Sequence, residues 1–187
     1  HDVTKGVVAL YDRNVEAGAG ANGWTADLVA YGEVTQKQIN DGIESIAQLA
    51  DIQNPLNGMR VYVKSYYAGQ GKGGGTFVYD STKASVNDGG IIINGWVRQY
   101  FGVIDPYMFG AWGDWDAYNQ VGHDDTVAFQ KCLDYIANNI QNVRVGGSPS
   151  VRLKSGSYRV SSLYVNRGIR GFGFSMFGDG ETSQLWF

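Results

Sequence analysis

The stretch GHDDTVAFQKCLDYIANN, residues 122–139, places a histidine and two aspartates directly before an apolar run. Asp124, Asp125 and Thr126 are residue types that accept hydrogen bonds from the free amides of a first helical turn and suit its positive end. We therefore interpret these three residues as the structural cap of a helix. The apolar residues that follow recur at helical spacing and predict one buried stripe, formed by Phe129, Cys132, Leu133, Ile136 and Ile140.

The spacing of the polar residues around this helix start argues against a metal or catalytic site. Asp114, Asp116 and Asp125 would occupy the first, third and twelfth positions of a calcium loop, but its fifth and sixth positions hold a tyrosine and an asparagine. A ligand and a glycine are required there. A zinc site needs more histidines or cysteines than His123 and the single cysteine supply. We predict no metal site, no cofactor and no catalytic residue within residues 1–187.

The composition excludes two classes of partner. The chain has 187 residues and a net charge of −3 from 15 basic and 18 acidic residues, without a long run of either sign. A nucleic-acid-binding face would need clustered basic residues, and a membrane span would need about 20 consecutive apolar residues; we predict neither partner. The 27 glycines and 12 tyrosines, with only 3 prolines, favour a β-rich protein with many turns.

The first half of the chain is predicted to hold a connector and a linker helix. Residues 1–34 include EAGAGANG, which has too few side chains to pack, and Thr35 with Gln38 forms a capping-box pattern at the start of a helix within residues 35–55. The helix carries apolar residues at heptad spacing, a pattern that favours three or more strands when both core positions are isoleucine. It is equally compatible with an amphipathic helix lying on its own domain. The candidate trimer-interface residues are Ile39, Ile43, Ile46 and Ala50.

Residues 56–103 are predicted to form a small β module. MRVYVKSYY, residues 59–67, alternates apolar and polar positions as a half-buried strand does. AGQGKGGG, residues 68–75, lacks the Gly-Lys-Ser/Thr ending of a phosphate-binding loop, so we interpret it as a flexible hairpin turn. TFVYD and GGIIINGWVRQYF supply the further strands.

Three stretches in order resemble the opening of the pectate-lyase-like, right-handed parallel β-helix of bacteriophage tailspike depolymerases. They are FGAWGD (109–114), DDTVAFQKCLD (124–134) and VRLKSGSYRVSSL (151–163). The β module and the connector resemble the segments upstream of that β-helix in tailspikes. One departure is WDAYNQVGH (115–123), which implies an added loop. The resemblance implies a helix that caps the first coils over residues 104–187.

The resemblance also implies partners and a location. A tailspike is a homotrimer in the virion tail, joined to the tail or to an adaptor protein by its N-terminal segment, and its C-terminal part binds the host surface polysaccharide. Leu153, Ile169 and Leu185 are sixteen residues apart, a spacing that predicts about two coils. We expect the chain to be a truncated solenoid whose catalytic carboxylates lie beyond it, so the enzyme class of the whole protein, lyase or hydrolase, stays open.

We therefore predict the virion-attached N-terminal region of a tailspike that anchors and trimerises a capsule- or O-antigen-degrading receptor-binding protein. One alternative is a small free-standing pectate-lyase-like polysaccharide enzyme, although its candidate carboxylates, Asp114, Asp116, Asp179 and Glu181, show no favourable spacing. Another is a sugar-binding β module. Its candidate sugar contacts are the aromatic residues Trp112, Trp115 and Tyr118, which could stack on sugar rings.

Overall fold

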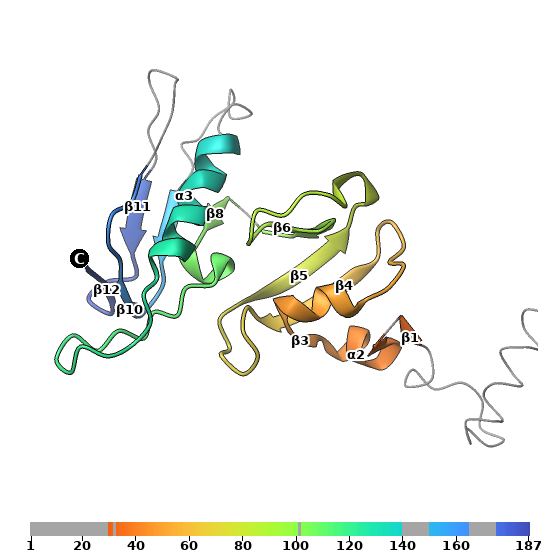
Figure 1. Cartoon of the computed structure of the whole chain (residues 1–187), viewed down its shortest axis with the longest axis horizontal. Coiled ribbons are helices and arrows are strands. Elements are labelled where there is room, and N and C mark those ends of the chain that lie inside the picture. Colours follow the sequence, from red (N-terminus) through yellow and green to blue (C-terminus); the bar gives the residue numbers. More distant parts are fainter. Residues whose placement is uncertain (1–29, 32, 101, 140–149, 165–174) are drawn as a thin grey trace, which may run out of the picture.

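The computed structural model describes residues 30–187 apart from residues 32, 101, 140–149 and 165–174. The described chain consists of a β module followed by a segment of parallel strands and one longer helix (Figure 1). The predicted connector lies outside the described residues except at its end, where β1 (Ala30–Tyr31) pairs with β2 (Val34–Thr35). No helix in the described ranges has the length and apolar character needed to cross a membrane. The protein is mainly β, as predicted.

A five-stranded sheet forms the β module. β3 (Ile43–Ser45) runs parallel to β4 (Arg60–Ser65), and the other neighbouring strands are antiparallel. β4 alternates as the sequence predicts, with Val61, Val63 and Ser65 buried and the residues between them exposed. One face of the sheet therefore carries the core of the module. The strand order is β3 (Ile43–Ser45), β4 (Arg60–Ser65), β5 (Gly73–Tyr79), β7 (Trp96–Arg98) and β6 (Ile92–Ile93).

The predicted continuous helix within residues 35–55 is wrong. α2 (Gln36–Asp41) begins with the predicted capping box between Thr35 and Gln38 and ends at Gly42, whose φ is +89°. An added Cβ at Gly42 would lie 2.9 Å from a ring carbon of Tyr62. Because glycine adopts this backbone conformation without steric cost, the chain leaves the helix there and continues as β3 and the 3-10 helix η2 (Ile46–Asp51).

The four proposed coiled-coil positions are distributed over these three elements. Ile39, Ile43 and Ile46 are 6%, 2% and 7% exposed and belong to the core of the module, whereas Ala50 is exposed. They form no heptad seam, which requires one continuous helix. The coiled-coil interpretation of these residues is therefore wrong, and the sheet begins at residue 43, earlier than the predicted module boundary at residue 56.

The glycine-rich stretch between β4 and β5 is a hairpin, as predicted, but its last three glycines lie within β5. An added Cβ at Gly74 would lie 2.3 Å from the carbonyl oxygen of Lys64, and one at Gly73 would lie 2.0 Å from that of Tyr107. These glycines allow two stretches of backbone to pack directly on β5. The 3-10 helix η3 (Ser81–Lys83) follows β5.

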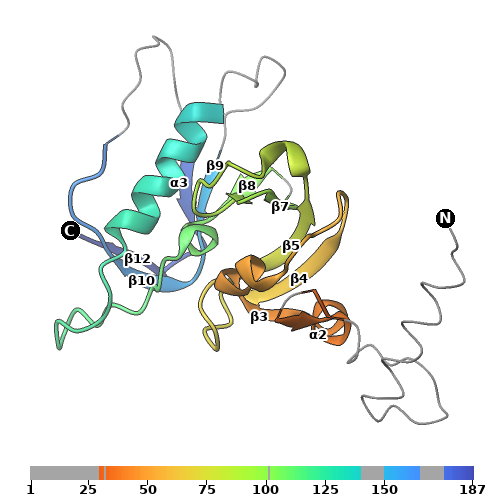
Figure 2. The ribbon, with the colours of Figure 1, turned by 45° about the vertical axis from the view of Figure 1, so that its right-hand side comes forward.

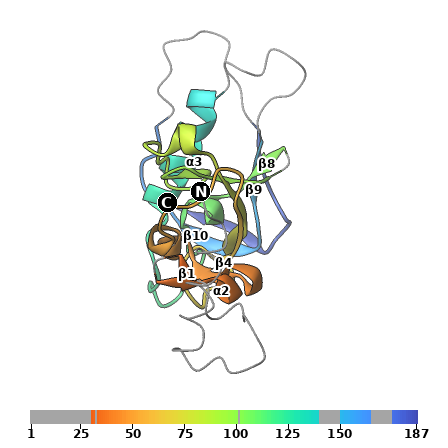
Figure 3. The same ribbon diagram turned by 90° about the vertical axis from the view of Figure 1, so that its right-hand side faces the viewer.

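The second half of the chain contains two ladders of parallel strands. β9 (Ser150–Leu153) lies between β8 (Val103–Ile104) and β11 (Ser175–Gly178), and β8 and β9 are seen side by side in Figure 3. β10 (Gly156–Arg159) pairs with β12 (Ser183–Trp186). Successive parallel strands on a repeating path are typical of stacked solenoid coils.

The step between these parallel strands differs from the predicted spacing of sixteen residues. Ser150 pairs with Ser175 and Gly156 with Ser183, so that the steps are 25 and 27 residues. Leu185 pairs with Tyr158 instead of continuing from Leu153. The third residue of the predicted series, Ile169, lies outside the described residues.

α3 (Thr126–Asn139) covers these strands (Figure 2). The predicted stripe is confirmed at Phe129, Cys132, Leu133 and Ile136, all buried. Its last member, Ile140, lies outside the described residues. Most of this stripe packs into a second core cluster with Val151, Tyr158 and other strand residues. The helix therefore covers apolar side chains of the first strands, as a solenoid cap does.

Candidate functional site

The described structure brings polar groups together at the junction between the β module and the segment that begins at β8. Arg98 of β7 is 3% exposed. Its Nε donates to the carbonyl oxygen of Gly90 at 2.9 Å, and its Nη atoms donate to those of Gly74 and Gly73 at 2.6 and 2.9 Å. Its guanidinium also lies over the Phe77 ring, 4.5 Å from the centroid. Burial lowers the pKa of Arg98 to about 10, so this residue remains charged at neutral pH.

Three side chains on this side of the module donate hydrogen bonds to residues 108–112, which follow the module in the chain. Arg98 Nη2 reaches the carbonyl oxygen of Met108 at 3.5 Å, at the end of the 3-10 helix η4 (Pro106–Phe109). Gln70 Nε2 donates to the carbonyl of Ala111 at 3.2 Å, and Lys72 Nζ donates to that of Trp112 at 2.9 Å. Three side chains of the module therefore hold the backbone of residues 108–112.

Asp125 fixes the following residues from the opposite side. It is 1% exposed, and its carboxylate accepts the amides of Trp112 at 2.6 Å and Gly113 at 3.0 Å. Burial raises the pKa of Asp125 above its usual value, although these two hydrogen bonds act in the other direction. The segment 108–113 is thus held between the β module and the start of α3.

The three predicted cap residues have different roles. Asp124 accepts the amide of Thr126 at 2.9 Å and so satisfies one free amide at the start of α3. The hydroxyl of Thr126 accepts the amide of Ser161 at 2.8 Å, which joins the helix start to the strand segment. The interpretation of the Asp125 side chain as a cap is wrong, because its carboxylate binds amides of the preceding loop.

The predicted sugar contacts are largely engaged within the chain. Trp112 lies between Tyr67 and His123, with ring centroids 4.7 and 3.9 Å away and nearly parallel planes. The guanidinium of Arg159 lies over the Trp115 ring at 4.7 Å. Tyr118 is 94% exposed, so it alone of the three is free on both faces.

The carboxylates considered for catalysis are dispersed. Asp114 pairs with His123 at 2.8 Å, and the hydrogen bonds from His123 outweigh the effect of partial burial and hold the pKa of Asp114 below its usual value. Asp116 accepts the amides of Tyr118 and Asn119 within its own turn. Asp179 pairs with Arg152 at 2.6 Å. These contacts support structural roles, and within the described residues no cluster of three or more potential ligands could hold a metal ion.

Sequence reasoning missed Arg98, Gln70 and Lys72. The alternation Trp96-Val97-Arg98 contains a signal for Arg98, since side chains alternate along a strand and Arg98 must point to the same face as the buried Trp96. Gln70 and Lys72 lie in the hairpin turn, and their partners are 41 and 40 residues away. No local pattern marks such contacts.

The comparisons with known proteins agree with this architecture. Residues 42–101, which include the whole five-stranded sheet, match the model of the phage tail protein small four-stranded β-sheet domain. No curated protein sequence matches the chain.

Several solved tailspikes share the fold. The tailspike of Acinetobacter phage vB_ApiP_P1 is 27% identical with a TM-score of 0.53, covering 76% of this chain and 23% of its own. The tailspike of Acinetobacter baumannii phage AM24 is 23% identical with a TM-score of 0.58, covering 88% and 26%. Tailspike protein 2 of an Escherichia coli O157:H7 bacteriophage is 23% identical with a TM-score of 0.56, covering 92% and 19%.

The chain thus spans about a fifth to a quarter of the length of the solved tailspikes that it matches. The family model covers the β module, and the structural likeness extends over the parallel strands and α3. Together these matches support a phage tailspike N-terminal region with a location in the virion tail.

Proposed function

We propose that this chain anchors a homotrimeric tailspike to the tail or to an adaptor protein, and that the whole protein binds and degrades a host capsule or O-antigen polysaccharide. The polysaccharide part of the proposal rests on the sequence resemblance to tailspike depolymerases. The attachment part rests on the architecture of the residues described above.

The junction is the observation that carries the proposal. Arg98, Gln70 and Lys72 of the module hold residues 108–112, and Asp125, the residue before α3, holds residues 112–113. An attachment region must transmit the orientation of the tail to the part that meets the host. A joint formed by several hydrogen bonds, two of them to a buried carboxylate, supports this role because buried charge-assisted hydrogen bonds are the stronger ones.

Formation of a trimer would stabilise a module of this small size. The sheet has one covered face, and small domains bury a limited fraction of their surface, so association of three copies would cover more of it. We expect the 187-residue chain to elute with a light-scattering mass three times its 20.4 kDa. A monomeric mass at all accessible concentrations would contradict the trimerising role.

Attachment and degradation are tested separately. Tail particles that lack the tailspike should bind the added 187-residue chain saturably, and capsule of the host strain should lose viscosity only when the longer tailspike is added. Binding of the chain to host cells instead of tail particles would favour the sugar-binding alternative. Loss of viscosity with the 187-residue chain alone would favour the free-standing enzyme.

A further inference from the structure

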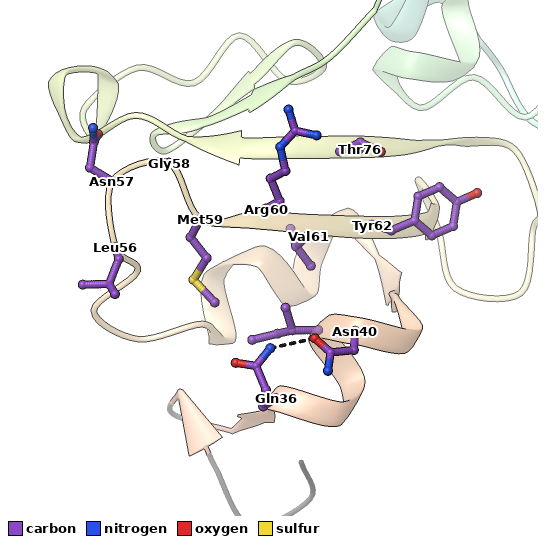
Figure 4. A pocket seen from close by; sticks show the side chains of 11 residues that line it. Gln36, Asn40, Leu56, Asn57, Gly58, Met59, Arg60, Val61, Tyr62 and Thr76 are labelled. Atoms are coloured by element: carbon purple, nitrogen blue, oxygen red, sulfur yellow. Dashed lines mark hydrogen bonds between the residues drawn. The ribbon is translucent and has the colours of Figure 1, made fainter.

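A groove of about 630 Å³ lies between α2 and β4 (Figure 4). Buried Ile39 and Val61 contribute to its apolar lining, and Leu56 and Tyr62 at its margin are 68% and 51% exposed. The side chains of Gln36 and Asn40 bond to each other on the helix side. The groove thus combines an apolar lining with polar groups along one wall.

The strand wall of this groove is an unpaired edge. β3 pairs with β4 only at Val63 and Ser65, so among the described residues no strand lies beside the first half of β4. Met59 accepts the amide of Tyr79, and hydrogen-bonded pairs alternate along an antiparallel ladder. The carbonyl of Met59 and the backbone groups of residues 61 and 63 therefore face β5, and the amides of Arg60 and Tyr62 face the groove.

The groove also has an unmatched charge. Arg60 is exposed on β4, and among the described residues it forms no ion pair with a carboxylate. None of the eleven residues that line the groove is acidic. An occupant that carries a carboxylate would therefore complement the groove in charge as well as in shape.

The strands that the structure describes give a second copy of this chain no segment that suits the groove. The outer edge of β3 is blocked by Gln48, whose Oε1 accepts the amides of Glu44 and Ser45, and Asp88 accepts the amide of Ile92 at β6. The short strands β1, β2, β11 and β12 contain no acidic residue that could pair with Arg60 of another copy. Pairing of β4 with its own copy would be two-fold symmetric, which a three-fold assembly does not provide.

We propose that an extended segment of a separate virion protein binds in this groove as an added strand beside Arg60–Tyr62. Main-chain hydrogen bonds to an open sheet edge supply affinity, and side-chain pockets supply specificity. The segment would place an apolar side chain against Ile39 and Val61 and a carboxylate against Arg60. The proposal rests on the attachment role given above and identifies its surface.

The test uses the 187-residue chain and tail particles of its phage that lack the tailspike. Arg60→Glu reverses the charge in the groove, and Lys64→Glu reverses a charge on the same strand and the same face outside it. Lys64 forms an exposed ion pair with Glu44, so its loss costs little stability. We expect Arg60→Glu to weaken binding to the particles at least tenfold and Lys64→Glu to change it less than twofold, with unchanged melting temperatures.

Hydrogen exchange locates the added strand. The amides of Arg60 and Tyr62 should exchange quickly in the free chain and at least tenfold more slowly on the particles. If the wild-type chain bound without this protection, and Arg60→Glu bound equally well, the groove would not be the binding surface. The attachment role would still hold. Absence of any binding would overturn both. Protection already present in the free chain would assign the groove to a second copy if it depends on concentration, or to another segment of the same chain if it does not.

Discussion

The carboxylate of Asp125 accepts the amide hydrogen of Trp112 across an N···O distance of 2.6 Å, thirteen residues before it in the chain. This bond and its neighbour from Gly113 place a buried acid where a helix cap would otherwise stand. Its titration therefore reports on the loop that joins the β module to α3.

We expect the Asp125 carboxylate to make stability depend on pH. Because its pKa is raised in the folded chain, the folded state binds this proton more tightly than the unfolded state, whose pKa is about 4. Its contribution is fully present below that value and is lost as the pH rises through the folded pKa. The unfolding free energy of the wild type relative to Asp125→Asn should therefore fall as the pH rises from about 4, the unfolded pKa, through the folded pKa.

Urea unfolding across this pH range measures the difference, and Asp124→Asn is the matched control. Asp124 has a pKa lowered chiefly by its hydrogen bond with Thr126, so its stabilising contribution is lost as the pH falls. The wild type compared with Asp124→Asn should thus show the opposite slope. A rising difference for Asp125 would contradict the effect of burial.

Replacement of Arg98 by methionine should destabilise the chain by about 2–4 kcal/mol, because it leaves buried carbonyl oxygens without donors. The partners that lose their bonds include the carbonyls of Gly73, Gly74 and Gly90. Arg60→Met is the control, since this exposed position should change the unfolding free energy by less than about 0.5 kcal/mol. Equal effects of the two substitutions would show that the buried guanidinium is not needed.

Replacement of Gly74 by alanine should cost about 3 kcal/mol or more, because the added Cβ meets backbone that cannot move aside as a flexible side chain could. The nearest atom is the carbonyl oxygen of Lys64 at 2.3 Å. Gly58→Ala is the control. Its φ of +85° is strained for alanine but nothing lies within 4 Å of the new Cβ, so a cost of about 1–2 kcal/mol is expected. Thermal unfolding of both variants separates steric contact from backbone strain.

Truncation of Trp112 to alanine should lower the unfolding free energy by about 2–4 kcal/mol, because both faces of its ring are in contact within the chain. Tyr118→Ala should change the unfolding free energy by less than about 0.5 kcal/mol, since the side chain is 94% exposed. If Trp112→Ala instead kept its stability and abolished binding to host polysaccharide, Trp112 would be a sugar contact.

The sequence-based interpretation succeeded where a local pattern and its packing coincide. The stripe of α3 and the alternation of β4 are periodicities of their own elements, and each is buried on the predicted side. The isoleucines of residues 39–46 led to a wrong prediction of a coiled coil because their spacing suits a heptad. In the structure Gly42 ends the helix, and a helix, a strand and a 3-10 helix bury these isoleucines in one core.

The junction could not be predicted in the same way. Asp125 precedes a helix and has the composition of a cap, but its partners are fixed by the path of the loop before it. The contacts of Gln70 and Lys72 with residues 111 and 112 depend on how two separate segments pack. Such pairs become visible only in three dimensions.

The polar contacts that Arg98, Gln70 and Lys72 make across the junction end on main-chain carbonyl oxygens. Carbonyl groups are present in every sequence, so these contacts do not read the side chains of residues 108–112. If recombination joined a different downstream segment at this border, its backbone carbonyls could still accept hydrogen bonds from Arg98, Gln70 and Lys72. These backbone contacts are thus compatible with recombination that joins one β module to different downstream segments.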